Sequence, residues 1–367
     1  MVKLGDVCTI NPRLPKNANP EQEVTFLAMA AVSEKGEISS QETRILHETK
    51  KGFTYFERGD VLLAKITPCF ENGKATLTNN LNTQIGFGST EFHVLRAFPD
   101  LILPEFIFYL VWNERFRIAA AKEMTGSAGQ KRVSTDYLKE YKFYLPSIFE
   151  QEKIVAALNK GYSIHRKRQQ AIKLADDFLR AKFLEMFGTP ANNIHRFPTG
   201  KIRDLVDSVN YGTSAKASID SGEYPILRMG NITYQGGWDF TDLKYLDLSV
   251  KEKDKFLVKE GDLLFNRTNS KELVGKTAVY EENRPMAFAG YLIRVRPNPI
   301  GNNYYISGYL NSIHGKITLM NMCKSIVGMA NINAQELQNI EILIPPKHLQ
   351  DEYEIIYKKI KKGLSIY

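Results

Sequence analysis

The chain of 367 residues has few cysteines and no long apolar run. Cys8, Cys69 and Cys323 lie far apart, and an odd count without a Cys-x-x-Cys pair argues against a disulfide framework and against a structural zinc site. No stretch reaches the ~20 apolar residues that a membrane-spanning helix needs, and the first residues carry no apolar signal segment. We therefore expect a cytoplasmic protein with reduced thiols and no membrane partner.

The motifs of common catalytic and cofactor sites are missing as well. There is no Gly-x-Gly-x-x-Gly dinucleotide fingerprint, no Gly-x-Ser-x-Gly nucleophile turn and no Asn- or Asp-Pro-Pro-Tyr segment of a base methyltransferase. Gly275-Lys276-Thr277 resembles the end of a phosphate-binding loop, but Ser270 stands where that loop needs glycine. The histidines are scattered without metal-ligand spacing. The sequence therefore indicates a binding protein that has no catalytic, metal or cofactor site of its own.

Positive charge exceeds negative charge without being concentrated. The 49 Lys and Arg residues against 41 Asp and Glu residues give a net charge of +8. Residues 1–149 carry 18 basic and 17 acidic residues, so their net charge is only +1. A basic excess favours a polyanionic partner. Its even spread means that such a partner would be held by local groups and not by a bulk field.

What the sequence does contain is a second copy of itself. Residues 57–63 (ERGDVLL) match 259–265 (KEGDLLF) at an offset of 202, and 138–146 (LKEYKFYLP) match 337–345 (LQNIEILIP) at an offset of 199. Several matches in one order, with offsets that drift by only three residues, are hard to obtain by chance. We therefore predict a tandem duplication of a unit of about 200 residues, which is the size of a domain and not of a solenoid repeat.

Both copies have the same order of local patterns. Short β-like segments come first, then a helical pattern, then a last strand that ends at proline. The expected strands are 60–66, 92–96, 141–145, 262–267, 291–296 and 340–344, and the expected helices are 104–122 and 303–323. The fold class is therefore predicted as α+β, with two tandem domains of mixed sheet and helices over residues 1–149 and 188–348.

A long proline-free segment, residues 150–187, follows the first domain. Ten positions from Val155 to Met186 are spaced alternately three and four apart, and seven of them are apolar, which is typical of a coiled-coil seam. A helix of this length would extend about 57 Å at 1.5 Å per residue. We expect it to act as a central spacer. A second segment, residues 349–367, continues the same spacing over about half the length, at Leu349, Tyr353, Ile356 and Ile360.

These segments resemble type I restriction–modification specificity subunits. The resemblance is carried by the Gly-Asp strand of both copies, by the Pro-x-x-x-x-Gln entry to each spacer segment, and by the helix end Phe183-Leu-Glu-Met-Phe-Gly188, and it covers essentially the whole chain. It implies two target recognition domains, each followed by a spacer helix, with the two helices packed as an antiparallel coiled coil. The short second segment departs from this pattern.

The resemblance also implies a function. The chain would read a two-part asymmetric DNA sequence and would have no catalytic site. Its partners would be double-stranded DNA, methyltransferase (M) subunits and restriction (R) subunits, and S-adenosylmethionine, ATP and magnesium would be held only by the partner subunits. The alternative is a non-enzymatic protein-interaction scaffold built on the long helix. The recognition part of a fused restriction–methylation enzyme is disfavoured because no catalytic segment is present.

Candidate DNA contacts are polar residues beside the shared strands, where the two copies diverge. In the first domain they are Lys65, Thr67, Asn72, Lys74, Ser127, Gln130, Lys131 and Arg132; in the second they are Asn266, Arg267, Asn269, Lys271, Lys276, Asn331 and Asn333. Arginine suits guanine, and asparagine or glutamine suits adenine, in the major groove. Lysine and serine more often hold phosphate. The alternative for each residue is a solvated loop side chain, and the 18 tyrosines and 20 phenylalanines are expected mainly in the core.

Overall fold

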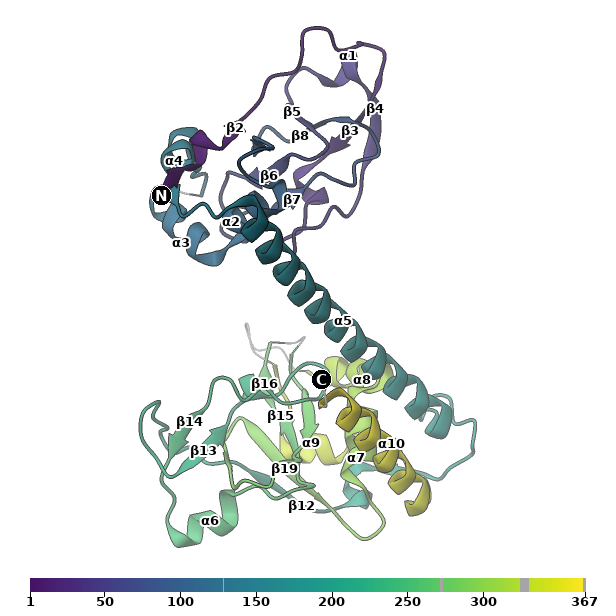
Figure 1. Ribbon diagram of the computed structural model, residues 1–367. Coiled ribbons are helices and arrows are strands. Elements are labelled where there is room, and N and C mark those ends of the chain that lie inside the picture. Colours follow the sequence, from purple (N-terminus) through teal and green to yellow (C-terminus); the bar gives the residue numbers. More distant parts are fainter. Residues whose placement is uncertain (128, 271–272, 324–329, 366–367) are drawn as a thin grey trace. The chain divides into compact units, whose positions relative to one another are not determined.

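The computed structural model describes residues 1–127, 129–270, 273–323 and 330–365. The chain divides into two compact units, unit 1 (Met1–His165) and unit 2 (Arg166–Tyr367), and helix α5 (Ile148–Phe187) contributes residues to both (Figure 1). Each unit combines β-sheet with helices, so the α+β prediction is confirmed. The long helix predicted over residues 150–187 is present as α5.

Unit 1 contains two four-stranded sheets and one short ladder. Its strands are β1 (Val2–Lys3), β2 (Cys8–Ile10), β3 (Glu23–Leu27), β4 (Glu42–Ile45), β5 (Thr54–Glu57), β6 (Val61–Ala64), β7 (Ala75–Leu77), β8 (Ile85–Gly88), β9 (Phe92–Ala97) and β10 (Lys142–Phe143). The sheets have the orders β2-β9-β6-β7 and β4-β3-β8-β5, and β3 runs parallel to β8. β1 pairs with β10.

The helices of unit 1 are α1 (Leu46–Thr49), α2 (Pro104–Trp112), α3 (Glu114–Lys122) and α4 (Thr135–Glu140). Helices α2, α3 and α4 pack on the first sheet, whereas α1 lies beside β4 of the second sheet. The single helix predicted over 104–122 is in fact two, because Asn113 leaves the helical conformation and its side chain accepts a hydrogen bond from Arg115 N, 2.8 Å away, which caps α3. The core between sheet and helices includes Val61, Leu95 and Ile107, all fully buried.

Unit 2 repeats this plan. Its strands are β11 (Thr199–Lys201), β12 (Val206–Tyr211), β13 (Tyr224–Leu227), β14 (Lys244–Leu246), β15 (Leu263–Asn266), β16 (Thr268–Asn269), β17 (Thr277–Val279), β18 (Ala287–Phe288), β19 (Leu292–Pro297), β20 (Ala330–Asn331) and β21 (Glu341–Leu343). The order β12-β19-β15-β17 corresponds strand by strand to β2-β9-β6-β7, and β13 runs parallel to β18 as β3 does to β8. The matching order supports the predicted duplication.

The helices of unit 2 are α6 (Val250–Phe256), α7 (Asn303–Asn311), α8 (Ile313–Met322), α9 (Ala334–Gln338) and α10 (Lys347–Ser365). Helix α7 packs on the four-stranded sheet and on α8 and α10, whereas α6 packs against β18 of the three-stranded sheet. Ser312 separates α7 from α8 as Asn113 separates α2 from α3, because its hydroxyl accepts a hydrogen bond from Gly315 N, 3.0 Å away. Gly308 allows α7 to approach α5 closely, since a Cβ at this position would lie 2.6 Å from the ring of Phe183.

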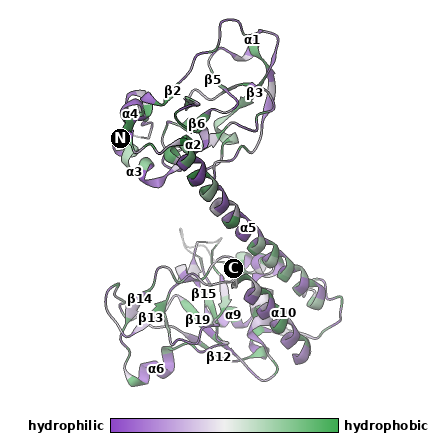
Figure 2. Cartoon of the chain, in the orientation of Figure 1, coloured by the Kyte–Doolittle hydropathy of each residue, from purple (hydrophilic) through white to green (hydrophobic). Residues whose placement is uncertain are grey.

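Helix α10 lies antiparallel to the end of α5 within unit 2. The rings of Tyr353 and Phe183 are 5.3 Å apart, and Lys361 Nζ lies 2.8 Å from Asp176 Oδ1, so later residues of α10 meet earlier residues of α5. The predicted seam is therefore only partly buried: Phe183 is 1% exposed, whereas Ile172 is 39% exposed. Figure 2 shows hydrophobic and hydrophilic residues mixed along α5.

Candidate nucleic-acid interface

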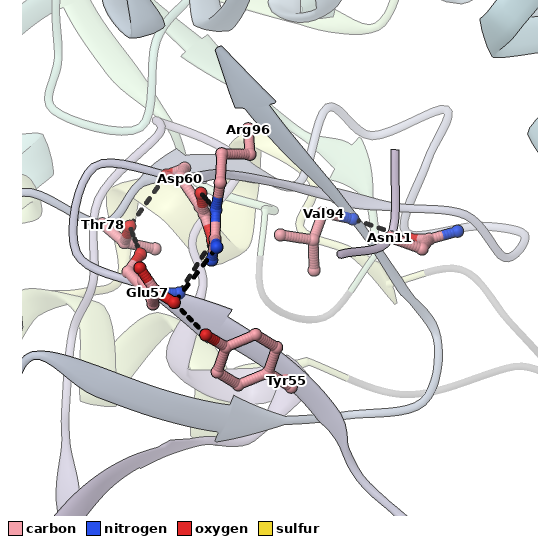
Figure 3. A network of polar contacts seen from close by, with 7 residues as sticks. All are labelled: Asn11, Tyr55, Glu57, Asp60, Thr78, Val94 and Arg96. Carbon is pink, nitrogen blue, oxygen red and sulfur yellow. Dashed lines mark hydrogen bonds and ion pairs between the residues drawn. The ribbon is translucent and has the colours of Figure 1, made fainter. Parts of the chain in front are cut away.

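The Gly-Asp turn that the two copies share holds the start of β6 in place in unit 1. Gly59 has φ +93°, a conformation that glycine adopts without strain. Asp60 is buried and accepts hydrogen bonds from Glu57 N at 2.7 Å and from Nε and Nη2 of Arg96, both at 2.8 Å (Figure 3). This paired carboxylate raises the pKa of Arg96. The turn and the neighbouring strand β9 are thereby locked to each other.

Unit 2 builds the same turn with the equivalent residues. Gly261 has φ +87°, and Asp262 accepts a hydrogen bond from Lys259 N at 2.9 Å. Arg296 donates from Nε and Nη2 to the two oxygens of Asp262, at 2.8 and 3.0 Å. A second guanidinium, that of Arg294, lies 3.9 Å away and is 4% exposed. The Gly-Asp motif is thus explained by the folding of the strand and not by ligand binding.

The Pro-x-x-x-x-Gln motif also has a folding role. Gln151 is fully buried at the start of α5, where its amide donates to the carbonyls of Leu101 and Pro146 at 3.0 and 2.9 Å and accepts from Leu103 N at 2.9 Å. Gln350 does the same at the start of α10, donating to Ile300 O at 3.0 Å and to Pro345 O at 2.8 Å. In each unit this glutamine ties a spacer helix to the loop before a helix of the domain, which is α2 in unit 1 and α7 in unit 2.

In unit 1 the predicted basic loop lies beside the end of β6. Thr67 N donates to Lys131 O at 3.0 Å, and Val133 N donates to Lys65 O at 2.9 Å. Two segments that are about 60 residues apart in sequence are therefore held side by side by backbone hydrogen bonds. Ser127, Gln130 and Lys131 are exposed on this loop.

Several predicted contacts in unit 1 already have partners within the unit. Arg132 donates from Nε and Nη2 to the two oxygens of Glu91, at 2.9 and 2.8 Å, and this pairing lowers the pKa of Glu91. The remaining partners are Glu71 for Thr67, Glu34 for Asn72, and the carbonyl of Met29 for the ammonium of Lys74, 3.3 Å away. The exposed residues of the loop are thus freer to meet a ligand than Arg132 is.

Unit 2 brings the matching segments together in the same way. Strand β16 pairs with β20, with Thr268 opposite Asn331, and Ile332 N donates to Arg267 O at 2.9 Å. The guanidinium of Arg267 lies over the ring of Tyr211, 4.9 Å from its centroid. Asn331 is exposed beside it. The predicted early and late segments therefore form one surface in each unit.

A cleft of about 600 Å³ opens next to this surface in unit 2. Two predicted residues, Asn269 and Lys276, line it, together with Arg228, Lys244 and Tyr291. Tyr291 is 56% exposed. Burial lowers the pKa of Lys276. Arginine, lysine and tyrosine around a cleft can meet both a negative charge and a planar ring.

Three of the predicted residues are buried or already have a partner within their unit. Asn266 is fully buried, because every residue of β15 is in the core, so its amide cannot reach DNA from this position. The side chain of Asn333 caps α9 by accepting from Glu336 N at 2.9 Å, which is a folding role. Arg132 is held by Glu91 as described above. Lys271 lies outside the described residues.

Four residues that complete these surfaces are not among those predicted from the sequence. The tyrosines and phenylalanines are expected mainly in the core, yet Tyr211 and Tyr291 are 41% and 56% exposed. Arg228 and Lys244 come from β13, β14 and their flanks, more than 20 residues before the segment around Lys276. The signal for Tyr291 was its place next to Gly290, a glycine shared by both copies.

Among the described residues, no group of three or more histidine, cysteine, aspartate or glutamate side chains could hold a metal ion. Nor is any helix in that part of the chain long and apolar enough to span a membrane.

The chain is similar to known proteins over most of its length. The family described as "Type I restriction modification DNA specificity domain" matches residues 1–174 and 196–365. The type I restriction enzyme EcoAI specificity subunit of Escherichia coli is 31% identical over 268 residues, and the EcoEI specificity subunit of the same species is 32% identical over 270 residues. Each alignment covers 71% of this chain and 45% of the relative, so the matched region spans less than half of those proteins.

A solved structure shares the fold. The S subunit of the type I restriction-modification system from M. genitalium superposes with a TM-score of 0.60 at 13% identity, covering 100% of this chain and 90% of that one. At this identity the likeness concerns the fold alone.

Proposed function

Because the chain belongs to the type I restriction-modification DNA specificity family, we propose that it is the subunit that selects the DNA sequence in a type I complex. Each unit contacts one part of a two-part duplex site. The observation that carries this proposal is the repeated surface: in both units, an exposed polar segment lies beside the strand that follows the Gly-Asp turn, with different side chains in each. A shared scaffold with unlike surfaces suits an asymmetric site.

The exposed polar residues of these surfaces supply the contacts. In unit 1, Gln130 and Lys131 can reach a base edge and a phosphate. In unit 2, Arg267 can pair with guanine, and Asn331 with adenine. The Nε of Arg267 is buried without a hydrogen-bond partner among the described residues, and its guanidinium rests on Tyr211, which orients it before any ligand arrives.

Helix α5 links the two units, and its number of residues sets the gap between the two parts of the DNA site. It is a single helix of 40 residues, from Ile148 to Phe187. A helix adds about 1.5 Å per residue, and half-site spacing in dimeric readers follows the geometry of the protein in the same manner. Linking two weak contacts also raises the overall affinity through effective concentration.

The chain works with partner subunits. Methyltransferase and restriction subunits dock on it, and S-adenosylmethionine, ATP and magnesium are bound by those partners. Exposed apolar side chains on α5 support a docking role, since Ile164, Leu174 and Phe178 are 59%, 61% and 49% exposed. On this view the chain contributes recognition and assembly but no catalytic group.

Footprinting of the assembled complex on its target DNA tests the proposal. Two protected patches separated by an unprotected gap of fixed length are expected. One continuous patch, or no protection, would contradict it.

A protein-interaction scaffold is the second candidate, favoured by the same exposed apolar residues of α5. The variant Arg267→Ala separates the two candidates. It should weaken DNA binding by the complex and leave subunit assembly unchanged if the chain reads DNA, whereas a scaffold would show no DNA effect. Assembly is measured by size-exclusion chromatography with light scattering, and DNA binding by fluorescence anisotropy.

A further inference from the structure

The cleft beside β16 contains a lysine whose ammonium has no acidic partner among the residues that the structure describes. Lys276 is 8% exposed and has no hydrogen-bond or ion-pair partner for its ammonium group among the described residues. The other two cations of the lining are Arg228, whose guanidinium is paired with Asp242 at 2.8 Å, and Lys244. Among the described residues that line the cleft, none is acidic.

The surroundings of Lys276 add positive charge instead of neutralising it. Lys316 lies near it, and burial, together with the smaller effects of the charges of Arg180 and Lys276, lowers the pKa of Lys316 to about 8. The ammonium of Lys316 reaches only the carbonyl of Gly275, at 3.4 Å, and the face of Tyr234. An ammonium that has lost part of its hydration without gaining an acceptor is unfavourable in the folded protein. An anion bound in the cleft would therefore stabilise this part of unit 2.

The duplicate position in unit 1 lacks this feature. Lys74 corresponds to Lys276 at the offset of 202 residues, and its ammonium donates to the carbonyl of Met29, 3.3 Å away. Met29 begins a 3₁₀ turn, η2 (Met29–Ala31), whose counterpart in unit 2 is η4 (Met229–Asn231). Both copies therefore have the lysine and the turn, but in unit 2 Met229 lines an open cleft and no described residue accepts a hydrogen bond from the ammonium.

We propose that the Lys276 cleft binds a phosphate group of the DNA backbone and anchors unit 2 on the duplex. This inference rests on the proposed function, because it assigns one DNA contact to unit 2. An ammonium is a compact point charge with three donors and no acceptor, which suits a phosphate oxygen. Arg228 and Lys244 line the same cleft and can approach the same or the adjacent phosphate. Tyr291 offers an exposed ring to the sugar or base.

A lysine that binds phosphate and a lysine that only supports the fold differ in how their replacement changes protein stability and DNA affinity. Replacing Lys276 by methionine removes the unpaired charge and keeps an unbranched side chain that is one atom shorter, so the free protein should become more stable. The same change should weaken DNA binding and should remove one counterion from the salt dependence. Stability and binding therefore move in opposite directions.

The test compares the wild-type chain, Lys276→Met, Lys276→Gln and a control, each in the assembled complex. The control is Lys253→Met, a lysine of unit 2 that is already paired with Glu223 at 3.2 Å. Binding of a labelled duplex that carries the host's methylated sequence is followed by anisotropy over a KCl series. Both Lys276 variants should bind roughly tenfold more weakly near ~0.1 M salt, with a slope of log K against log salt that is shallower by about 0.9. Lys253→Met should leave both quantities unchanged.

Thermal unfolding without DNA and competition with tripolyphosphate complete the test. An unfolding midpoint of Lys276→Met at or above that of the wild type supports the anchor, and a lower midpoint together with weaker binding shows a structural lysine and overturns it. Unchanged affinity and slope in both variants also overturn it. If tripolyphosphate binds the wild type more tightly than the variants while duplex binding is equal in all, the cleft serves free phosphates and the DNA anchor is wrong. A wild-type complex that binds no duplex rejects the proposed function itself.

Discussion

Units 1 and 2 fix the same strand in the same way and then present different side chains at its end. Asp60 with Arg96, and Asp262 with Arg296, form equivalent ion pairs with distances of 2.8–3.0 Å. Beyond that strand, unit 1 has an arginine neutralised by Glu91, whereas Arg267 in unit 2 rests on an aromatic ring. Interactions that hold the strand are kept because the fold needs them, and the surface beside it is free to change.

The second sheet differs more than the first. Unit 1 has four strands in the order β4-β3-β8-β5, whereas unit 2 has three, β14-β13-β18, and α6 precedes the Gly-Asp turn where unit 1 has β5. The segment after α6 makes only an isolated bridge, Leu257 with Ala287. The divergence thus extends beyond the polar residues to the sheet that backs the cleft of unit 2.

The largest expected effect comes from breaking the shared ion pair. Asp60→Ala leaves Arg96 and the amide of Glu57 without their acceptor, and a loss of about 3 kcal/mol in the free energy of unfolding is expected, at the low end for a broken buried pair because Arg96 is partly exposed. Asp262→Ala should cost about 4 kcal/mol, since Arg294 beside it is almost completely buried. Urea unfolding measures both.

The exposed pair between Glu42 and Arg44 is the control for these two variants. Glu42→Ala should change the free energy of unfolding by less than about 1 kcal/mol. Equal effects of Asp60→Ala and Glu42→Ala would show that the Gly-Asp turn is not the common scaffold.

The next effect distinguishes the buried glutamines at the starts of α5 and α10. Gln151 makes three hydrogen bonds with its buried amide, whereas the Oε1 of Gln350 has no partner among the described residues. Gln151→Ala should therefore destabilise by about 3 kcal/mol and Gln350→Ala by about 2 kcal/mol, at roughly 1 kcal/mol for each hydrogen bond lost. Urea unfolding of the full chain gives both values, and a larger loss for Gln350→Ala would reverse the comparison.

A smaller effect tests whether two equivalent caps are only structural. Ser134 caps α4 by accepting from Tyr137 N at 3.0 Å, and Asn333, 199 residues later, caps α9. Ser134→Ala and Asn333→Ala should each cost about 1 kcal/mol. If Asn333 has no further role, the DNA affinity of the two variants is the same. A selective loss of DNA affinity in Asn333→Ala would restore the role predicted from the sequence.

The smallest effect concerns the ion pair between Arg132 and Glu91 in unit 1. Arg132 lowers the pKa of Glu91 below its ordinary value of 4.5, so the stability that this pair adds is present above that pH and is lost as the pH falls through the lower, folded-state pKa. Unfolding curves of the wild type and Arg132→Ala should therefore differ at pH 7 and converge at low pH. A difference that persists at pH 2 would mean that Arg132 stabilises the loop by packing and not by charge.

The features that occur in both copies could be predicted from the sequence, whereas features that depend on tertiary packing could not. The Gly-Asp turn, the proline-ended strands and the long helix were visible because each depends on a local motif, and the two copies supported each other. The breaks at Asn113 and Ser312 were missed because a capping side chain does not interrupt the hydrophobic period around it. The burial of Asn266 and the exposure of Tyr291 were missed because both depend on strands distant in sequence.

The sequence predicts which segments form the candidate site, but not which of their side chains are free to bind a ligand. Segments 65–74 and 126–132, and their counterparts in unit 2, were chosen as divergent neighbours of shared strands, and backbone hydrogen bonds do bring the early and late segments together. Which side chains stay free could not be predicted, since Glu91 and the carbonyl of Met29 come from elsewhere in the chain. The open cleft of unit 2 depends on the second sheet, which differs between the copies.

Sequencing of DNA methylation in the host genome tests most directly whether two units read two half-sites. The comparison uses strains that carry the wild-type chain, no chain, or a chain with Asn269→Ala and Asn331→Ala in unit 2. We predict a methylated motif in two parts around an unspecified gap, absent without the chain, in which the unit 2 variant relaxes one part and leaves the other part and the gap unchanged. An undivided motif, a motif that persists without the chain, or equal changes in both parts would contradict the account.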